Sequence, residues 1–274
     1  MLGRGVVPAG TPVLRADDLG ALRGDGIFET MHLRGGRPWL LDEHLARMAR
    51  SAARLELALP PGAALAELVG QAAAGWGAEA EGGLRLVCTR GPEDGGPVTV
   101  FATAFAISPT TLRARREGVA VVTAPLGFAV DARSAAPWLL GGAKTVSYAV
   151  NMASLRWAAT QGADEVLWLS SEGYALEAPT ATLVWLADET LWTVPPEQTG
   201  ILAGTTARWL LNHAGDLGFG AAERLVRPDE LADADGVWLV SSVRGAAEVR
   251  ALDGVARKSS AHTGAVIDLL GFAR

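Results

Sequence analysis

The sequence predicts an α/β protein built from two domains. Its 274 residues suffice for one large or two medium domains, and 49% of them are hydrophobic, so the chain can bury a sizeable core. Segments with the alternation of strands and segments with helical periodicity follow one another along the chain. A polar, arginine-rich stretch at 109–117 separates two such groups. We therefore place the domains at residues 1–112 and 119–274, with a linker at 113–118.

The first domain is expected to contain two strands, two helices and two further strands. Apolar and polar residues alternate from Ile27, and the Gly35-Gly36 pair predicts a hairpin turn to a return strand. Asp42 is a suitable N-cap for the helix that follows. The expected elements are strands at 27–34 and 38–41, helices at 43–55 and 63–76, and strands at 83–90 and 98–107. This order predicts a compact unit with an antiparallel sheet.

The second domain is expected to contain more strands than helices. The expected helices cover 148–161, 207–214 and 260–272. The expected strands cover 118–125, 165–170, 174–177, 182–186, 190–193, 225–228, 236–241 and 247–252. Turn residues such as Gly173 separate several of these short strands.

Composition excludes several classes of function. The net charge of −6 argues against nucleic acid as a main partner and shows no basic patch for a membrane surface. No apolar run is long enough to span a bilayer, and the first residues lack the apolar core of a signal peptide. The single cysteine rules out an intrachain disulfide, and the four histidines lack zinc-site spacing. We expect a cytoplasmic protein without a metal site that acts on a small molecule.

Lysine is scarce in this chain. Only Lys144 and Lys258 are present, and the other strongly basic side chains are arginines. A lysine amine can lose its proton and attack a carbonyl carbon, whereas a guanidinium cannot. Lys144 lies in a long apolar region after a pair of glycines. It is therefore a candidate nucleophile, although a surface lysine at the start of a helix would also fit.

Three stretches offer contacts to an anion. Gly204-Thr205-Thr206 precedes an expected helix, whose first amides lack internal partners and lie at the positive end of the macrodipole. Ser241-Ser242 ends an expected strand and offers hydroxyls and amides, and Arg47 offers a bidentate contact. Each also has an ordinary explanation: an N-cap threonine, strand-end serines and a solvated arginine.

Glu177 lies in an apolar stretch, and a carboxylate there needs a partner. A protonated heteroaromatic nitrogen would be one such partner, and a structural arginine would be another. A reactive lysine, a phosphate cradle and an acid facing a pyridine nitrogen are what pyridoxal 5'-phosphate requires. Asp25 and Glu29 are either catalytic or ordinary turn and strand residues.

The order of these motifs resembles the fold-type IV (class IV) pyridoxal-phosphate enzymes. These include branched-chain aminotransferases, D-amino-acid aminotransferases and aminodeoxychorismate lyases. The similar stretches are Gly24-Asp25-Gly26-Ile27-Phe28-Glu29-Thr30, His44-Leu45-Ala46-Arg47-Met48, Lys144, Gly173-Tyr174-Ala175-Leu176-Glu177, Gly200-Ile201-Leu202-Ala203-Gly204-Thr205-Thr206 and Ser241-Ser242. Residues 143–152 and 238–242 look most like bacterial aminodeoxychorismate lyases.

The resemblance implies a class IV aminotransferase-like fold, of the D-amino-acid aminotransferase-like kind. It would consist of a small α/β domain and a larger pseudo-barrel domain that carries the cofactor lysine, with the cofactor between them, in a homodimer. Lys144 would bond to the cofactor and act as acid and base, and Glu177 would pair with the pyridinium nitrogen. The remaining cofactor contacts implied are Arg47, Tyr148, Gly204, Thr205, Thr206, Ser241 and Ser242. Thr30 would lie at the substrate face as a further catalytic candidate.

Two departures from the family pattern bear on function. Thr182 stands where the family commonly has asparagine after the glutamate, which puts in doubt the contacts around Glu177 but not Glu177 itself. The loop after Arg90 lacks the Arg-x-His that D-amino-acid aminotransferases use to hold a substrate carboxylate, and this disfavours that activity.

The resemblance implies a lyase that converts 4-amino-4-deoxychorismate to 4-aminobenzoate and pyruvate in folate synthesis. An aminotransferase acting on branched-chain or D-amino acids, with a 2-oxo acid acceptor, is the alternative, because it would share the same first steps. A non-catalytic protein that binds a phosphate ligand is a third possibility, and it would be colourless.

Overall fold

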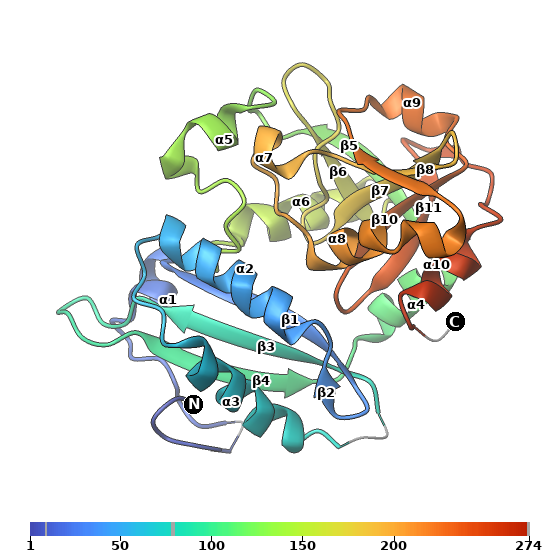
Figure 1. The fold of residues 1–274 in the computed structure, drawn as a ribbon. Coiled ribbons are helices and arrows are strands. Elements are labelled where there is room, and N and C mark those ends of the chain that lie inside the picture. The colour runs from blue at the N-terminus through green and yellow to red at the C-terminus, as the bar shows by residue number, and fades with distance from the viewer. Residues whose placement is uncertain (9, 78–79, 273–274) are drawn as a thin grey trace. The chain divides into compact units, whose positions relative to one another are not determined.

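The computed structural model describes residues 1–8, 10–77 and 80–272. Within these residues the chain forms two compact units, one of Met1–Ser108 with Ala143–Tyr148, the other of Pro109–Gly142 with Ala149–Arg274 (Figure 1). The expected domains also include Ala9, Ala78, Glu79, Ala273 and Arg274, which lie outside the described residues.

The first unit contains a four-stranded antiparallel sheet in the order β2-β1-β3-β4. Its strands are β1 (Gly26–Arg34), β2 (Arg37–Pro38), β3 (Gly82–Thr89) and β4 (Thr99–Phe105). Its helices are α1 (Leu19–Arg23), α2 (Leu41–Arg54) and α3 (Gly62–Ala74). Helices α2 and α3 pack against the sheet and against each other (Figure 1). The order β1, β2, α2, α3, β3, β4 along the chain is the one expected from the sequence.

The start of α2 differs from the sequence-based expectation. Helix α2 begins at Leu41, so the return strand β2 is only two residues long. Its N-cap is Leu40, in the left-handed conformation with φ 56°, and Asp42 lies in the first turn. A carboxylate there still interacts favourably with the helix macrodipole, although it does not cap the helix.

The lysine-bearing segment Ala143–Tyr148 belongs to the first unit. The amide of Phe28 donates to the carbonyl of Lys144 at 3.0 Å, and the amide of Val146 donates to the carbonyl of Gly26 at 2.9 Å. The segment thus pairs with the start of β1, with Ile27 bridged to Thr145. The contacts differ here from the expected boundary, which placed Lys144 in the large domain.

The expected linker also differs from the structure. Residues Pro109–Glu117 form helix α4, which packs against strand β11 (Gly245–Leu252) of the second unit. Arg115 is buried on this helix and donates to the carbonyl oxygens of Val243 and Arg244. An arginine that is buried through hydrogen bonds to backbone is not distinguishable from a solvated one by polarity alone.

The second unit is built on an eight-stranded mixed sheet in the order β6-β5-β11-β10-β7-β8-β9, with β12 beside β11. Its further strands are β5 (Val119–Pro125), β6 (Glu165–Leu169), β7 (Thr182–Ala187), β8 (Thr190–Thr193), β9 (Gly220–Glu223), β10 (Gly236–Ser241) and β12 (Val255–Ala256). Its further helices are α5 (Ala132–Ala135), α6 (Ala149–Thr160), α7 (Pro196–Thr199), α8 (Thr205–Asn212), α9 (Pro228–Ala232) and α10 (Thr263–Leu269), with 3-10 turns η1 (Pro137–Leu139) and η2 (Ala214–Leu217). Trp185 and Trp238 are among the largest buried side chains of its core.

Two expected strands of this unit are absent from the sheet. The stretch expected at 174–177 is not a strand, although its backbone forms hydrogen bonds with Trp168 and Ser170 and Ala175 is bridged to Leu169. The strand expected at 225–228 is replaced by β9, which is largely exposed and pairs in parallel with β8. Its small residues Gly220, Ala221 and Ala222 give no hydrophobic pattern, so only the pairing reveals this strand.

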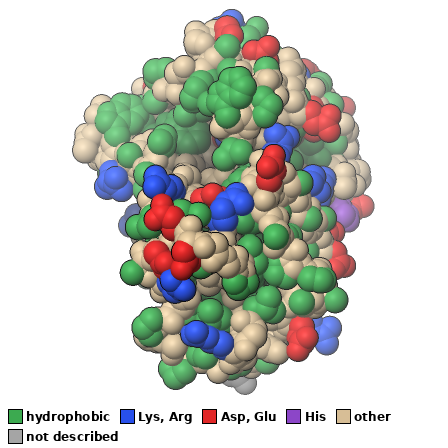
Figure 2. Space-filling view, turned by 90° about the vertical axis from the view of Figure 1, so that its left-hand side faces the viewer, with side chains coloured by type: hydrophobic (Ala, Val, Ile, Leu, Met, Phe, Trp, Pro, Cys, Tyr) green, Lys and Arg blue, Asp and Glu red, His purple; other side chains and the backbone are tan. Residues whose placement is uncertain are grey.

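Several large apolar side chains of the second unit remain exposed, including Trp138, Val150 and Trp157. Figure 2 shows apolar side chains gathered in the upper part of the face on which α5 lies. Over the described ranges, no helix has both the length and the apolar character needed to cross a bilayer.

Candidate active site

Lys144 is fixed by its backbone and by its side chain. Its amide donates to the Ser51 Oγ of α2 at 3.1 Å, and its carbonyl accepts from Phe28. Its Nζ lies 4.4 Å from the centroid of the Phe28 ring and 3.3 Å from the Tyr148 hydroxyl. The two rings meet edge to face with centroids 5.1 Å apart. Tyr148, expected as a cofactor contact, thus lies beside Lys144 within the first unit.

A buried cluster lies on the same face of α2 as Ser51, since His44, Arg47 and Ser51 follow at spacings of three and four residues. Arg47 donates through Nε and NH2 to the two oxygens of Glu29, at 2.8 and 2.7 Å, and His44 Nδ1 lies 2.6 Å from the same carboxylate. Burial raises the pKa of the Glu29 carboxyl, but Arg47 and His44 lower it by more than that. The net result is a pKa of about 2, below the usual 4.5. Burial lowers the pKa of His44, against the opposing effect of Glu29. The cluster is thus an ion pair of Glu29 and Arg47 beside a histidine whose ring favours the neutral form.

Both acidic residues left open by the sequence, Asp25 and Glu29, pair with arginines. Glu29 bonds to Arg47 and is a partner of the expected phosphate ligand, while Asp25 binds Arg90 Nε at 2.6 Å. Glu29 engages one edge of the Arg47 guanidinium, the edge formed by Nε and NH2. A fork of this kind fixes the plane of the guanidinium.

Thr30 lies on the same face of β1 as Phe28, because alternate residues of a strand share a face. Its register partner on β3 is Arg85, which therefore projects from that face too. Arg85 is the exposed residue of an otherwise buried strand, and its guanidinium lies 6.0 Å from the Phe28 ring centroid. Sequence reasoning did not single out Arg85. The available signal was a charged residue in the middle of an apolar strand.

Glu177 of the second unit has the structural arginine that was one of its two expected partners. Arg133 NH1 donates to Oε1 at 2.9 Å, and the amide of Leu202 donates to Oε2 at 3.0 Å. A carboxylate has about four lone-pair sites, so these two bonds leave capacity for another donor such as a pyridinium N–H. The arginine and the heteroaromatic nitrogen are therefore compatible partners.

Two glycines allow Arg133 to reach Glu177. A Cβ at Gly141 would lie 2.2 Å from the Arg133 carbonyl oxygen, and a Cβ at Gly200 would lie 2.6 Å from the Arg133 carbonyl carbon. Ser134 Oγ also donates to the carbonyl of Gln198 at 2.7 Å. Helix α5 is thus held against the segment that supplies the Leu202 amide. Sequence reasoning missed Arg133, although these glycines flank the two motifs.

A second group of expected residues meets at the N-terminus of α8. Thr205 Oγ1 and Thr206 Oγ1 each lie 3.4 Å from Ser242 Oγ, and all three side chains are buried. Gly204 is the N-cap residue of α8, and it has no side chain that could bond to the first amides of the helix. A Cβ at this position would lie 2.2 Å from Thr182 Oγ1. Ser241 is the last residue of β10 and pairs with Gly245.

This cradle fits a phosphate group. Buried hydroxyls, the first amides of a helix and the positive end of its macrodipole are the donors that phosphate prefers. Thr182, the departure from the family pattern, fills the space against Gly204. The expected phosphate ligands divide between the units, since Arg47 belongs to the first and Thr205, Thr206 and Ser242 belong to the second.

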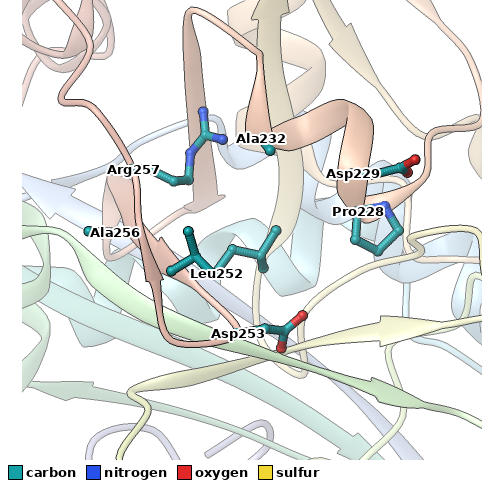
Figure 3. A pocket seen from close by; sticks show the side chains of 8 residues that line it. Pro228, Asp229, Ala232, Leu252, Asp253, Ala256 and Arg257 are labelled. Atoms are coloured by element: carbon teal, nitrogen blue, oxygen red, sulfur yellow. The ribbon is translucent and has the colours of Figure 1, made fainter.

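The expected site residues do not line the open pocket of about 320 Å³ drawn in Figure 3. Two of its three charged groups, Arg257 and Asp253, bind the chain itself. Arg257 donates to the carbonyl oxygens of Leu231 and Ala234, and Asp253 accepts from the amide and hydroxyl of Thr123. Since these two groups are hydrogen-bonded within the chain and most of the remaining wall is apolar, we do not assign the active site to this pocket.

Comparison with known proteins decides the family. Residues 26–252 match the family model for class IV aminotransferases. The chain belongs to the class IV aminotransferase family. Pyridoxal 5'-phosphate is accordingly the cofactor of this class IV enzyme, and solved relatives have been seen in forms that bind it.

Individual relatives agree over nearly the whole chain. A bifunctional aminodeoxychorismate lyase / D-amino acid transaminase of Mycobacterium tuberculosis is 41% identical over 91% of this chain and 89% of its own length. A hypothetical aminotransferase from Mycobacterium tuberculosis, solved with α-ketoglutarate and PMP, superposes with a TM-score of 0.94 at 40% identity, over 97% of this chain and 94% of its own. A fold IV transaminase of Curtobacterium pusillum gives 0.91 at 40% identity, over 97% and 90%.

These results confirm the expected fold class, the family resemblance and the cofactor. They establish a pyridoxal-phosphate enzyme of class IV, and both lyase and aminotransferase chemistry fit it.

Proposed function

We propose that this class IV enzyme is an aminodeoxychorismate lyase that forms 4-aminobenzoate and pyruvate. The observation that carries the proposal is the 41% identical relative, whose name includes this activity and which matches over nearly its whole length. The fixed position of Lys144 against Phe28, Tyr148 and Ser51 supports it from the structure.

The residues have distinct roles in this proposal. Lys144 would hold the cofactor, and its free amine would take the proton from the amine-bearing carbon of the substrate. The bound cofactor supplies an electron-withdrawing ring. Glu177, oriented by Arg133 and Leu202, accepts a hydrogen bond from the ring nitrogen. Thr205, Thr206, Ser242 and Arg47 bind the phosphate, beside Gly204 and Ser241.

Arg85 is proposed to bind a substrate carboxylate. It shares with Lys144 the Phe28 ring, which lies 6.0 Å from the guanidinium carbon and 4.4 Å from the lysine nitrogen. Thr30, opposite Arg85 in the sheet, lies at the substrate face. Aminodeoxychorismate and amino acids both carry carboxylates, so this contact serves either reaction.

Aminotransferase activity is the second candidate, and a specific observation favours it. The name of the Mycobacterium tuberculosis relative also includes D-amino acid transaminase, and a similar solved protein holds α-ketoglutarate and PMP. The loop after Arg90 lacks the expected carboxylate-binding motif, but Arg85 offers another cation on the same sheet. Aminotransferase activity therefore stands beside lyase activity as a candidate for this enzyme.

The deciding experiment is incubation of purified enzyme with 4-amino-4-deoxychorismate and no amino acceptor. Fluorescent 4-aminobenzoate together with equimolar pyruvate is the expected result. No 4-aminobenzoate, but amine transfer from D- or branched-chain amino acids to 2-oxoglutarate, would replace the lyase by the aminotransferase. A protein that stays colourless with added pyridoxal phosphate would contradict both.

We further propose that the enzyme acts as a cytoplasmic homodimer. The exposed apolar residues Val150 and Trp157 of α6, with Trp138 after α5, support a subunit interface. The single cysteine, Cys88, is buried and free, as suits a reducing compartment.

A further inference from the structure

We propose that Phe28 is a positioning residue for Lys144, and that its ring face stabilises the ammonium form of that lysine. The inference rests on the proposed function, in which the freed lysine becomes an ammonium group when it removes the substrate proton. In that step the substrate C–H bond breaks, the proton moves to Lys144 Nζ, and the electron pair stays with the substrate and the cofactor ring.

The geometry is that of a cation over an aromatic face. Lys144 Nζ lies 4.4 Å from the Phe28 ring centroid, within the roughly 6 Å at which a ring attracts a cation. Tyr148 adds a second ring with its centroid at 5.5 Å, and its hydroxyl oxygen accepts from Nζ at 3.3 Å. The attraction acts on the ammonium and not on the neutral amine, so it favours the protonated form.

The backbone fixes this arrangement. Phe28 and Lys144 are joined by the hydrogen bond from the Phe28 amide to the Lys144 carbonyl, and Ser51 holds the Lys144 amide. The edge-to-face contact with Tyr148 holds the Phe28 ring. Phe28 therefore keeps its face toward the lysine through contacts that do not depend on a bound cofactor.

The charged and titratable groups of the first unit around this lysine have partners of their own. Glu29 binds Arg47 and His44, and Lys144 acts electrostatically on the His44 ring. Arg85 lies over the same Phe28 ring at 6.0 Å and, as a second cation, opposes the ammonium form. The attraction on the Lys144 ammonium therefore comes from the faces of Phe28 and Tyr148 and from the Tyr148 hydroxyl oxygen, because Glu29 is bound to Arg47 and His44.

The size of the effect follows from the usual strength of such contacts. A cation–π contact shifts the balance between ammonium and amine about threefold to thirtyfold. Loss of the ring should therefore move the protonation midpoint of Lys144 down by about one pH unit. It should also slow proton abstraction several-fold, because the lysine becomes a weaker base.

The test is competitive acetylation of the cofactor-free protein between pH 7 and 11, read by mass spectrometry. The chain contains two lysines, and the exposed Lys258 serves as an internal reference in every sample. Phe28→Leu should lower the pH midpoint of Lys144 labelling by about one unit and leave Lys258 unchanged. Phe28→Tyr, which keeps a ring face, should retain the wild-type midpoint.

Phe105→Leu is the matched control, because Phe105 lies on β4 of the same sheet and contacts Arg85. It should not move the Lys144 midpoint. Equal midpoints in wild type and Phe28→Leu would overturn the inference, as would an equal fall in Phe28→Tyr. The proposed function fails differently, since wild-type enzyme would then form no 4-aminobenzoate, whatever the midpoint of Lys144 labelling.

Discussion

Lys144 is held at both ends, because its amide binds Ser51, its carbonyl binds Phe28 and its amine lies between two rings. Such a side chain is positioned before the cofactor arrives, which removes part of the ordering cost from the reaction. Lysine rather than arginine is required here because only an amine can bond to the cofactor aldehyde and later carry a proton.

Lys144→Ala should abolish turnover, at least 1000-fold, because no other group in the site can take over both tasks. The variant should still bind pyridoxal phosphate reversibly, through the phosphate cradle, without the absorbance of the lysine-bound form. Turnover and absorbance spectra provide the measurement. Lys258→Ala, at the exposed second lysine, should behave as wild type. Substantial turnover in Lys144→Ala would contradict the assignment.

Glu177→Gln should slow the reaction about 100-fold and change cofactor affinity less than tenfold. Arg133 and the Leu202 amide both donate to this side chain. A glutamine has one acceptor oxygen and a donor amide, so it cannot satisfy both donors and also accept from the ring nitrogen. Single-turnover rates and equilibrium binding separate the two effects. A wild-type rate would show that the ring nitrogen has another partner.

At the scale of elements, the N-terminus of α8 depends on one missing side chain. Gly204→Ala would bring a Cβ within 2.2 Å of the Thr182 hydroxyl, so either Thr182 or the start of the helix must move. We expect pyridoxal phosphate to bind at least tenfold more weakly, with little change for pyridoxal, which lacks the phosphate. Calorimetric titration with both compounds gives the ratio. Gly215→Ala is the matched control, because a Cβ there meets nothing within 4 Å, and an equal loss in that variant would contradict the prediction.

Helix α2 couples the stability of the first unit to pH. The pKa of Glu29 falls from its usual 4.5 to about 2 through Arg47 and His44, despite burial. A lowered carboxyl pKa stabilises the fold above pH 4.5, and this stability is lost as the pH falls from 4.5 toward 2. The contribution is roughly 3 kcal/mol. Burial lowers the pKa of His44, so charging this ring below its usual pKa of 6.5 adds to the loss.

Urea unfolding between pH 7 and 3 measures this dependence. Glu29→Gln should be less stable at pH 7, because Arg47 loses its carboxylate, and should lose less stability between pH 4.5 and 3 than wild type. An unchanged slope in the variant would show that other carboxyl groups carry the acid sensitivity.

The same elements show what the sequence can and cannot predict. Alternation, turn glycines and helix starts located β1, α2 and α8, because those signals are local. The docking of α5 could not be predicted, since Arg133 contacts Glu177 and Gly200, which lie far from it along the chain. Anion contacts by Thr205, Thr206 and Ser242 could be proposed from the sequence, but their meeting at the N-terminus of α8 depends on the fold. The exposed Arg85 could be recognised only through the sheet register.

At the scale of the whole molecule, the division into units follows contacts that sequence order hides. Ile27 is bridged to Thr145, and this long-range pairing transfers Ala143–Tyr148 to the first unit. A boundary placed at a polar stretch assumes that polarity means a linker, and α4 shows that it can mean a helix whose arginine binds backbone carbonyls.

The proposed dimer can be tested on α6. Of its twelve described residues, Ala158 alone is buried, while Val150 and Trp157 are 63% and 41% exposed. Positions seven apart lie on one side of a helix, so these two side chains form an apolar strip.

Trp157→Glu should weaken self-association about 100-fold or more, because an interface would have to bury a lone charge. Light scattering after size exclusion, over a range of concentrations, measures it. Leu22→Glu, which makes the same kind of change at an exposed residue of α1, should leave the dimer intact. A wild-type protein that is monomeric at all concentrations would contradict the homodimer. A Trp157→Glu variant that dimerises as tightly as wild type would place the interface away from α6.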